Sequence, residues 1–121
     1  MFVAQPGNLG TQLLAFAEEG IGIRAFSGSG NEAMITIEDY MECFEGDGMT
    51  KTVVMYIESI KNGRMFFEAA KRVGRKKPVI TLKGGRTQAG ISAAANHTGA
   101  MASNIKIFEA TCKQTGAIQA L

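Results

Sequence analysis

Apolar residues along the chain fall into short clusters separated by glycine, proline and charged residues. Two clusters, at Val53–Ile57 and at residues 78–82, are rich in β-branched residues, which is typical of strands buried on both faces of a parallel sheet. Shorter apolar runs occur at Phe2–Ala4 and at residues 117–118, and a partly alternating run covers residues 21–26. We predict a strand at each of these five places.

Between the predicted strands, apolar residues recur at helical spacing. Each such segment also has a stop or start signal, because glycine ends helices and threonine caps them. The predicted helices run from Leu9 to Gly20, from a Thr36 cap to Gly46, from near Gly63 through Val73, and from Ile105 to Gly116.

Strands that alternate with helices predict a parallel sheet covered on both faces. The expected fold class is α/β: a three-layer, flavodoxin-like domain with a five-stranded parallel sheet of order 2-1-3-4-5. With 121 residues the chain has the size of one domain, over residues 1–121. Apolar runs at both ends suggest either a domain excised from a longer multidomain chain or one subunit of an assembly.

The bulk composition excludes several classes of protein. A net charge of +2 is too small to indicate a nucleic-acid partner, and the basic run at residues 71–77 suits the end of a helix. No apolar run is long enough to cross a membrane, and no signal peptide is evident. The only cysteines, Cys43 and Cys112, are expected to be buried free thiols, so we predict a cytoplasmic protein without a structural metal.

Ligands of open parallel sheets bind beyond the carboxyl ends of the strands. Residues 5–8 follow the first predicted strand, and free N–H groups at such a helix start attract phosphate, although a simple tight turn explains them equally well. Residues 83–86 supply two cations and two glycines after the fourth strand. They lack the spacing of a P-loop, so a solvated turn is the default interpretation.

His97 is the only histidine, and it lies in a segment of small residues. A lone histidine is most often an ordinary surface or core residue, but a neutral imidazole is also a competent nucleophile toward phosphorus. Glu58 directly follows the third predicted strand. Its carboxylate is either solvated or accepts a ring N–H from a histidine, which would fix the tautomer of that histidine.

At these residues the chain resembles the NDP-forming acyl-CoA synthetases, relatives of succinyl-CoA ligase. The resemblance covers nearly the whole chain and corresponds to the flavodoxin-like second domain of the CoA-ligase half. It rests on six stretches in order, at residues 4–11 (AQPGNLGT), 30–33 (GNEA), 56–58 (YIE), 76–79 (KKPV), 82–86 (LKGGR) and 93–100 (AAANHTGA).

The resemblance implies an acid–thiol ligase that interconverts acyl-CoA, NDP and phosphate with acid, CoA and NTP. It implies three steps in the synthetic direction: an acyl phosphate forms, CoA displaces the phosphate, and a histidine carries a phosphoryl group to ADP. His97 matches that histidine and Glu58 matches the glutamate that holds it. Further residues match phosphate-binding positions or possible phosphate or loop contacts: Gln5, Gly7, Asn8, Gly99 and Ala100 for the first, and Asn31, Lys83 and Arg86 for the second.

The resemblance also implies what one domain lacks. CoA, ATP or ADP and Mg belong to the complete enzyme, together with a CoA-binding Rossmann domain, an ATP-grasp domain or subunit, and a small-molecule acid. The isolated domain is therefore expected to hold no cofactor and to be inactive. Two residues depart from the family pattern, because Pro6 replaces the usual Ser and Met34 replaces a frequent Asp.

Three other classes of protein use a fold of this kind. A non-catalytic regulatory domain, such as one fused to a protein acetyltransferase, commonly lacks the histidine that this chain has at position 97. A flavin-binding flavodoxin usually needs a phosphate loop rich in hydroxyl side chains and aromatic residues that flank the flavin ring. Residues 5–8 contain no hydroxyl side chain. A receiver domain needs an acidic cluster after its first strand, and none is present there.

Overall fold

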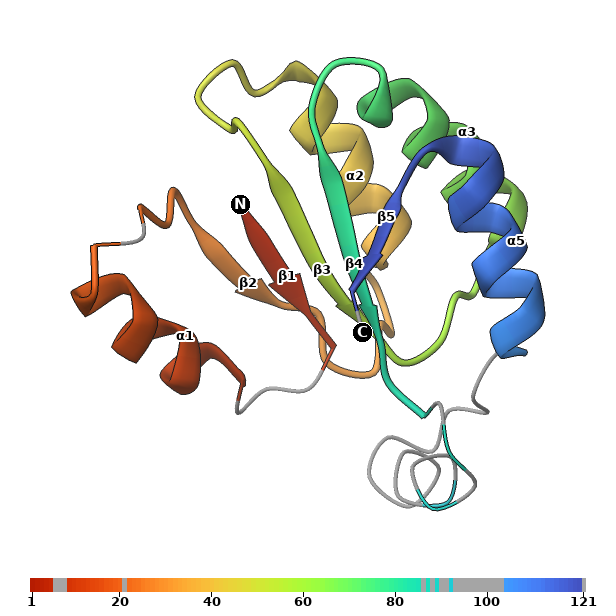
Figure 1. Ribbon diagram of the computed structural model, residues 1–121, viewed down its shortest axis with the longest axis horizontal. Helices are drawn as coiled ribbons and strands as arrows, with labels where there is room; N and C mark the ends of the chain where they lie inside the picture. The colour runs from red at the N-terminus through yellow and green to blue at the C-terminus, as the bar shows by residue number, and fades with distance from the viewer. Residues whose placement is uncertain are drawn as a thin grey trace.

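Five parallel strands form one sheet of order β2-β1-β3-β4-β5, as the strand–helix alternation predicts. The computed structural model describes residues 1–5, 9–20, 22–85, 87, 89, 92 and 104–120. All strands run in the same direction, so their carboxyl ends share one edge of the sheet (Figure 1). The strands are β1 (Phe2–Ala4), β2 (Phe26–Gly28), β3 (Val53–Ile57), β4 (Val79–Lys83) and β5 (Ile118–Ala120).

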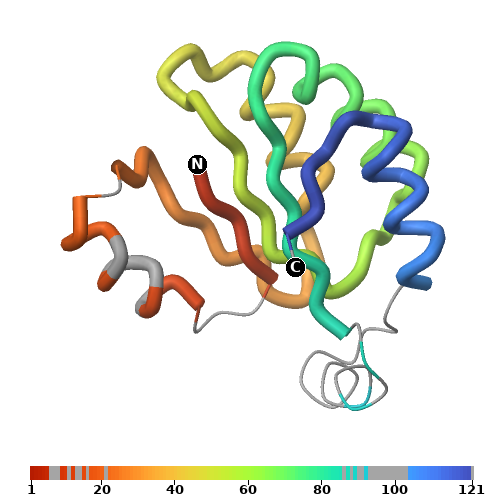
Figure 2. The backbone as a smooth tube through the Cα atoms, in the orientation of Figure 1, coloured from red at the N-terminus to blue at the C-terminus, as the bar shows by residue number. Residues whose placement is uncertain are grey.

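The helices lie on both faces of the sheet, which confirms the three-layer α/β fold. Helices α2 (Ile37–Gly46), α3 (Gly63–Gly74) and α5 (Ile105–Thr115) pack side by side on one face. Helix α1 (Leu9–Glu18) packs on β2 at the opposite face, as the trace in Figure 2 shows. Gly10 allows this close contact, because a Cβ there would lie 2.6 Å from the Phe26 ring and the ring would have to shift.

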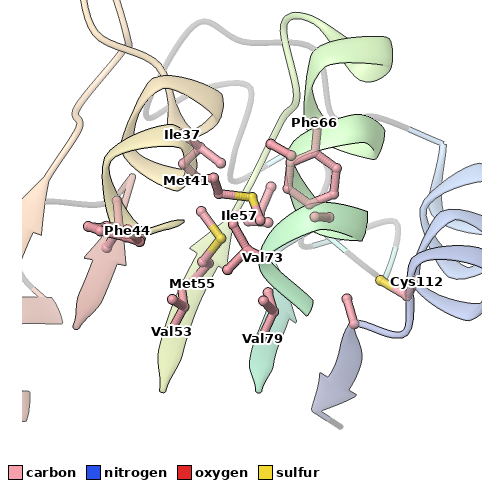
Figure 3. Close-up of a cluster of buried hydrophobic side chains, with 14 of the residues drawn as sticks. Ile37, Met41, Phe44, Val53, Met55, Ile57, Phe66, Val73, Val79 and Cys112 are labelled. Carbon is pink, nitrogen blue, oxygen red and sulfur yellow. The ribbon is translucent and has the colours of Figure 1, made fainter. Parts of the chain in front are cut away.

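The hydrophobic core fills the space between the sheet and α2, α3 and α5 (Figure 3). The Phe66 and Phe108 rings meet there with centroids 6.3 Å apart. Burial alternates along β3 and β4, with one face buried and the other only partly covered. Within the part of the chain that the structure describes, the prediction of strands buried on both faces is therefore wrong, because the helix placed there on the second face, α1, packs on the edge strand β2. The fully buried core side chains include Ile37, Met41, Phe44, Val53, Met55, Ile57, Phe66 and Val73.

The predicted helix starts are confirmed in detail. The Thr36 hydroxyl accepts from the Asp39 N–H while the Asp39 carboxylate accepts from the Thr36 N–H, a reciprocal cap that satisfies two backbone donors. The Asn62 side chain accepts from the Met65 N–H at 3.0 Å and caps α3. Gly116 ends α5 with φ of 79°, the left-handed conformation that favours glycine.

Three strands have boundaries that differ from those predicted, and the smallest difference is at β5, which begins at Ile118 instead of Ala117. The second strand was expected over residues 21–26, whereas the structure places β2 at Phe26–Gly28. The ladder decides this register, because Phe2 pairs with Phe26 and Ala4 with Gly28. The fourth strand was expected to begin at Pro78, but proline lacks the N–H that a ladder requires, so β4 runs from Val79 to Lys83.

The basic run at the end of α3 has the structural role that the sequence suggests. Arg72 pairs with Glu42 and Glu45, and the Lys76 ammonium lies 3.1 Å from the Glu45 carboxylate. These pairs join α3 to α2. No helix among the described residues is long and apolar enough to span a membrane.

The two cysteines have different environments. Cys112 is buried, as predicted, and its sulfur lies 3.6 Å from the Thr81 hydroxyl. Burial raises the pKa of the Cys112 thiol, because an apolar environment disfavours the thiolate. Cys43 is exposed, so the prediction of two buried thiols is wrong for this residue. It lies on α2 between the buried Met41 and Phe44, at a position that the helical period turns toward solvent.

We expect a thiol reagent such as DTNB to distinguish these cysteines. In the folded protein Cys43 reacts as a free thiol, whereas Cys112 reacts at least on the order of tenfold more slowly, because it must wait for local opening. Cys43→Ser should remove the fast phase and Cys112→Ser should leave it unchanged. A fast phase that persists in Cys43→Ser would contradict this assignment.

Candidate functional site

The carboxyl edge of the sheet brings together several of the residues that the sequence singled out. Four of them, Gln5, Asn31, Glu58 and Lys83, are described by the structure and lie at or near this edge. The others lie outside the described residues: Gly7, Asn8, Arg86, His97, Gly99 and Ala100.

Gln5 follows β1 directly, and its side chain crosses to the end of β3. The Gln5 amide oxygen accepts hydrogen bonds from the backbone N–H groups of Glu58 and Ser59, the second at 3.0 Å. The Gln5 amide nitrogen donates to the Ser59 carbonyl at 2.8 Å. Gln5 is buried, with 3% of its surface exposed. The side chain expected to meet a phosphate is thus bonded to the backbone that carries Glu58, while its role toward a phosphate stays a prediction.

Lys83 reaches the same backbone from the other side. Its ammonium donates to the carbonyls of Glu58 and Gly84, both at 2.6 Å. The side chain is 3% exposed. Burial lowers the pKa of Lys83 because it disfavours the ammonium ion, and the Glu58 carboxylate partly offsets that effect. Lys83 therefore places a buried positive charge beside Glu58.

Glu58 occupies the centre of this arrangement, because β3 lies between β1 and β4 in the sheet. Its side chain is half-buried, and its Oε2 atom is buried without a hydrogen-bond partner among the described residues. Tyr56, two residues earlier, has a raised pKa because of burial and of the nearby Glu58 charge. Both observations indicate that the Glu58 carboxylate lies in a sheltered position with an oxygen available to accept a further hydrogen bond.

The loop between β2 and α2 contains residues that the sequence analysis did not assign to the site. The Lys61 ammonium donates to the carbonyls of Asn31 and Glu32, at 2.6 and 2.9 Å. Glu32 adopts a positive φ of 56° and is buried, and its carboxylate accepts from the Ile37 N–H at 2.7 Å. Only tertiary contacts reveal these roles, since a glutamate at a left-handed position carries no local sequence signal.

Two buried carboxylates support this loop. Glu38 is fully buried and accepts from the Asn62 N–H at 3.1 Å, which ties α2 to the start of α3. Burial raises the pKa of Glu32; hydrogen bonds from Gln5 and Ile37 oppose this, and the charge of Glu38 adds to it. Among the residues that the structure describes, no three His, Cys, Asp or Glu side chains are placed to hold a metal ion.

The site presents the carboxylate of Glu58, and hydrogen bonds with Gln5 and Lys83 fix the backbone of this residue from two sides. A carboxylate in this position can accept a hydrogen bond from an imidazole N–H or a hydroxyl group and stabilise positive charge that develops on that group. Met34 stands where the family frequently has Asp. Its side chain is 92% exposed, so it does not pack in the core.

The fold and this edge define a flavodoxin-like α/β domain with a polar site at the carboxyl ends of its central strands. Residues 1–121 match the family described as succinyl-CoA ligase like flavodoxin domain. The chain belongs to that family.

Relatives of known activity agree. The chain is 41% identical over 119 residues to acetate–CoA ligase [ADP-forming] I subunit alpha of Pyrococcus furiosus, and 43% identical over 120 residues to subunit alpha of enzyme II. These alignments cover 98% of this chain but 26% of each relative, so the chain spans about a quarter of their length.

A solved structure agrees as well. A dinucleotide-forming acetyl-coenzyme A synthetase 1 of Ca. Korarchaeum cryptofilum, in complex with phosphate and ADP, superposes with a TM-score of 0.89 at 39% identity. That comparison covers 98% of this chain and 26% of the synthetase chain.

We expect Glu32→Gln to change how stability depends on pH. The folded-state pKa of Glu32 is raised above its ordinary value of 4.5, so the folded state binds more protons than the unfolded state above pH 4.5. This group's contribution is therefore fully present below pH 4.5 and is lost as pH rises through the folded-state pKa. The glutamine variant should lack that loss.

Urea unfolding at pH 4 and pH 7 measures the effect. The free energy of unfolding of Glu32→Gln minus that of wild type should increase from pH 4 to pH 7, whatever the variant costs at both values. Glu19→Gln, at an exposed position, serves as the control and should show no such change. A Glu32→Gln difference that is constant with pH would contradict the assignment.

Proposed function

We propose that this chain is the phosphohistidine-carrying domain of an NDP-forming acyl-CoA synthetase, an acid–thiol ligase, with His97 as the phosphorylated residue. The observation that carries the proposal is Glu58, a sheltered carboxylate at the end of the central strand, with a buried oxygen that has no partner among the described residues. The names of the relatives, which are ADP-forming acetate–CoA ligases, support the class of reaction.

The chemistry requires a neutral imidazole with one nitrogen directed at phosphorus. Glu58 accepts the N–H of the opposite ring nitrogen, which fixes the tautomer and stabilises the positive charge that develops as the imidazole attacks. The ammonium of Lys83, which is buried and donates to the Glu58 carbonyl, places a positive charge beside this carboxylate.

The expected order of steps is wrong in one respect. CoA displaces phosphate in the direction of acyl-CoA synthesis, whereas phosphohistidine transfers its phosphoryl group to ADP in the direction of ATP synthesis. Toward ATP, inorganic phosphate displaces CoA from the acyl-CoA thioester, giving an acyl phosphate and the free thiol. A His97 nitrogen then attacks the phosphorus and releases the carboxylate. Phosphohistidine finally transfers the phosphoryl group to ADP, which regenerates the imidazole. Toward acyl-CoA, the same steps run in reverse.

Phosphate binding is assigned to two segments that flank this chemistry. Gly7 and Asn8 precede α1, whose N-terminal N–H groups suit an anion. Gln5 lies beside them, but its side chain is bonded to the backbone of Glu58 and Ser59 and is not assigned to the phosphate. Gly99 and Ala100 follow the histidine and allow close backbone approach. Lys83, Arg86 and Asn31 complete the set as possible phosphate or loop contacts. Pro6 removes one N–H and leaves the neighbouring donors, so phosphate binding is weakened rather than lost.

The remaining functions belong to other domains. CoA requires a Rossmann domain, and the nucleotide with its Mg requires an ATP-grasp domain or subunit. The two free cysteines suit a reducing, cytoplasmic location.

Labelling with radioactive ATP tests the proposal on the full-length parent enzyme with its nucleotide-binding partner. Wild type should gain an acid-labile, base-stable label, and His97→Ala should gain none. Glu58→Gln keeps the shape of the side chain and loses its charge. Its label should form roughly tens of times more slowly, since a charged hydrogen bond contributes on the order of 2 kcal/mol.

Glu68→Gln, at an exposed position on α3, is the matched control and should label at the wild-type rate. Label retained by His97→Ala would overturn the proposal. Label that forms at the wild-type rate in Glu58→Gln would leave the histidine in place and remove its partner. A parent that binds its ligands but never labels would favour the regulatory alternative.

A second expectation concerns the 121-residue chain by itself. Purified alone, it should neither form acyl-CoA nor hydrolyse ATP, because the CoA and nucleotide modules are missing. A coupled assay for ADP release and for thioester formation checks this. Sustained turnover that copurifies with the chain and disappears in His97→Ala would contradict the assignment of those steps to other domains.

A further inference from the structure

The backbone on which Glu58 stands is held by side chains rather than by the regular ladder of the sheet. In the β1–β3 ladder, the Val54 N–H donates to the Met1 carbonyl at 2.9 Å, and the Gln5 N–H donates to the Tyr56 carbonyl at 3.3 Å. Continuing this parallel pattern would give the Glu58 N–H to the backbone carbonyl of residue 5. The side-chain oxygen of Gln5 accepts that hydrogen bond instead.

There is a structural reason why a side-chain oxygen replaces the backbone carbonyl as the acceptor. Pro6 follows Gln5, and its ring fixes φ and removes a backbone donor, so a regular strand is poorly suited to continue through it. The last N–H groups of the neighbouring strand still need acceptors, because buried backbone donors are costly when unpaired. The Gln5 amide satisfies two of them, at Glu58 and Ser59, and also donates to the Ser59 carbonyl.

We infer that Gln5 is a positioning residue, which fixes the backbone of Glu58 so that its carboxylate meets the histidine in a single orientation. The inference rests on the proposed function. Lys83 supports the same residue through its carbonyl, so Glu58 is held at its N–H by Gln5 and at its C=O by Lys83. Gln5 acts through Glu58 and needs no contact with the phosphoryl group.

The test uses the full-length parent with its nucleotide-binding partner and labelled ATP. Gln5→Met keeps the length of the side chain and removes the acceptor and the donor. Its maximal rate of histidine labelling should fall on the order of tenfold to a hundredfold, since a small misplacement of a catalytic group has an effect of this size. The ATP concentration that gives half the maximal rate should stay unchanged, because nucleotide binding is not affected.

A double-mutant cycle separates positioning from general damage. In the Glu58→Gln background, Gln5→Met should lower the rate less than about twofold, because the group it positions is already impaired. Hydrogen exchange should quicken at the Glu58 and Ser59 amides and stay slow within Val53–Met55. Gln12→Met, at an exposed position on α1, is the matched control and should leave the labelling rate and this exchange pattern unchanged.

Gln5→Asn serves if the methionine variant fails to fold. It keeps the amide but is one methylene shorter, so it cannot hold both N–H groups, and a similar loss of rate is expected. A folded Gln5 variant that labels at the wild-type rate, or that loses as much rate in the Glu58→Gln background as in the wild-type background, would overturn the inference. A wild-type enzyme without label at His97 would instead refute the proposed function, and the inference with it.

Discussion

The parallel register of β1, β3 and β4 is the constraint on which the site depends. Because the three strands run in the same direction side by side, Gln5, Glu58 and Lys83 come from distant parts of the chain to one edge. A shift of one residue in any pair would turn alternate side chains to the other face of the sheet. The core packed against α2, α3 and α5 prevents such a shift, since Val53, Met55 and Ile57 are all fully buried.

The polar groups of the site are buried, and hydrogen bonds offset the cost of removing them from water. Gln5, Glu32, Glu38 and Lys83 are all almost completely buried at or near the carboxyl edge. Each has backbone partners, so the cost of removing it from water is partly offset. One carboxylate oxygen each of Glu32, Glu38 and Glu58 has no partner within the described part of the chain, and the last of these is the one that the proposed chemistry uses.

The comparisons and the geometry support the function at different levels. Family membership and relatives at about 40% identity establish the kind of domain. The contacts around Glu58 add a physical reason why this position suits a carboxylate that orients a histidine. His97 lies outside the described residues, so its role rests on sequence and on the chemistry that Glu58 is placed to support.

The sequence by itself determined the order of strands, the helices, the Thr36 cap, the Gly116 helix end and the residue types that gather at the carboxyl edge. Local signals suffice for these features, because periodicity, capping and chain connectivity act over a few residues or follow from handedness. Tertiary structure alone decided the register of β2, the exposure of Cys43 and the direction in which the Gln5 side chain points. A ladder partner, a solvent-facing helix position and an acceptor for another strand's N–H all depend on which distant residue lies alongside, and no local pattern encodes that.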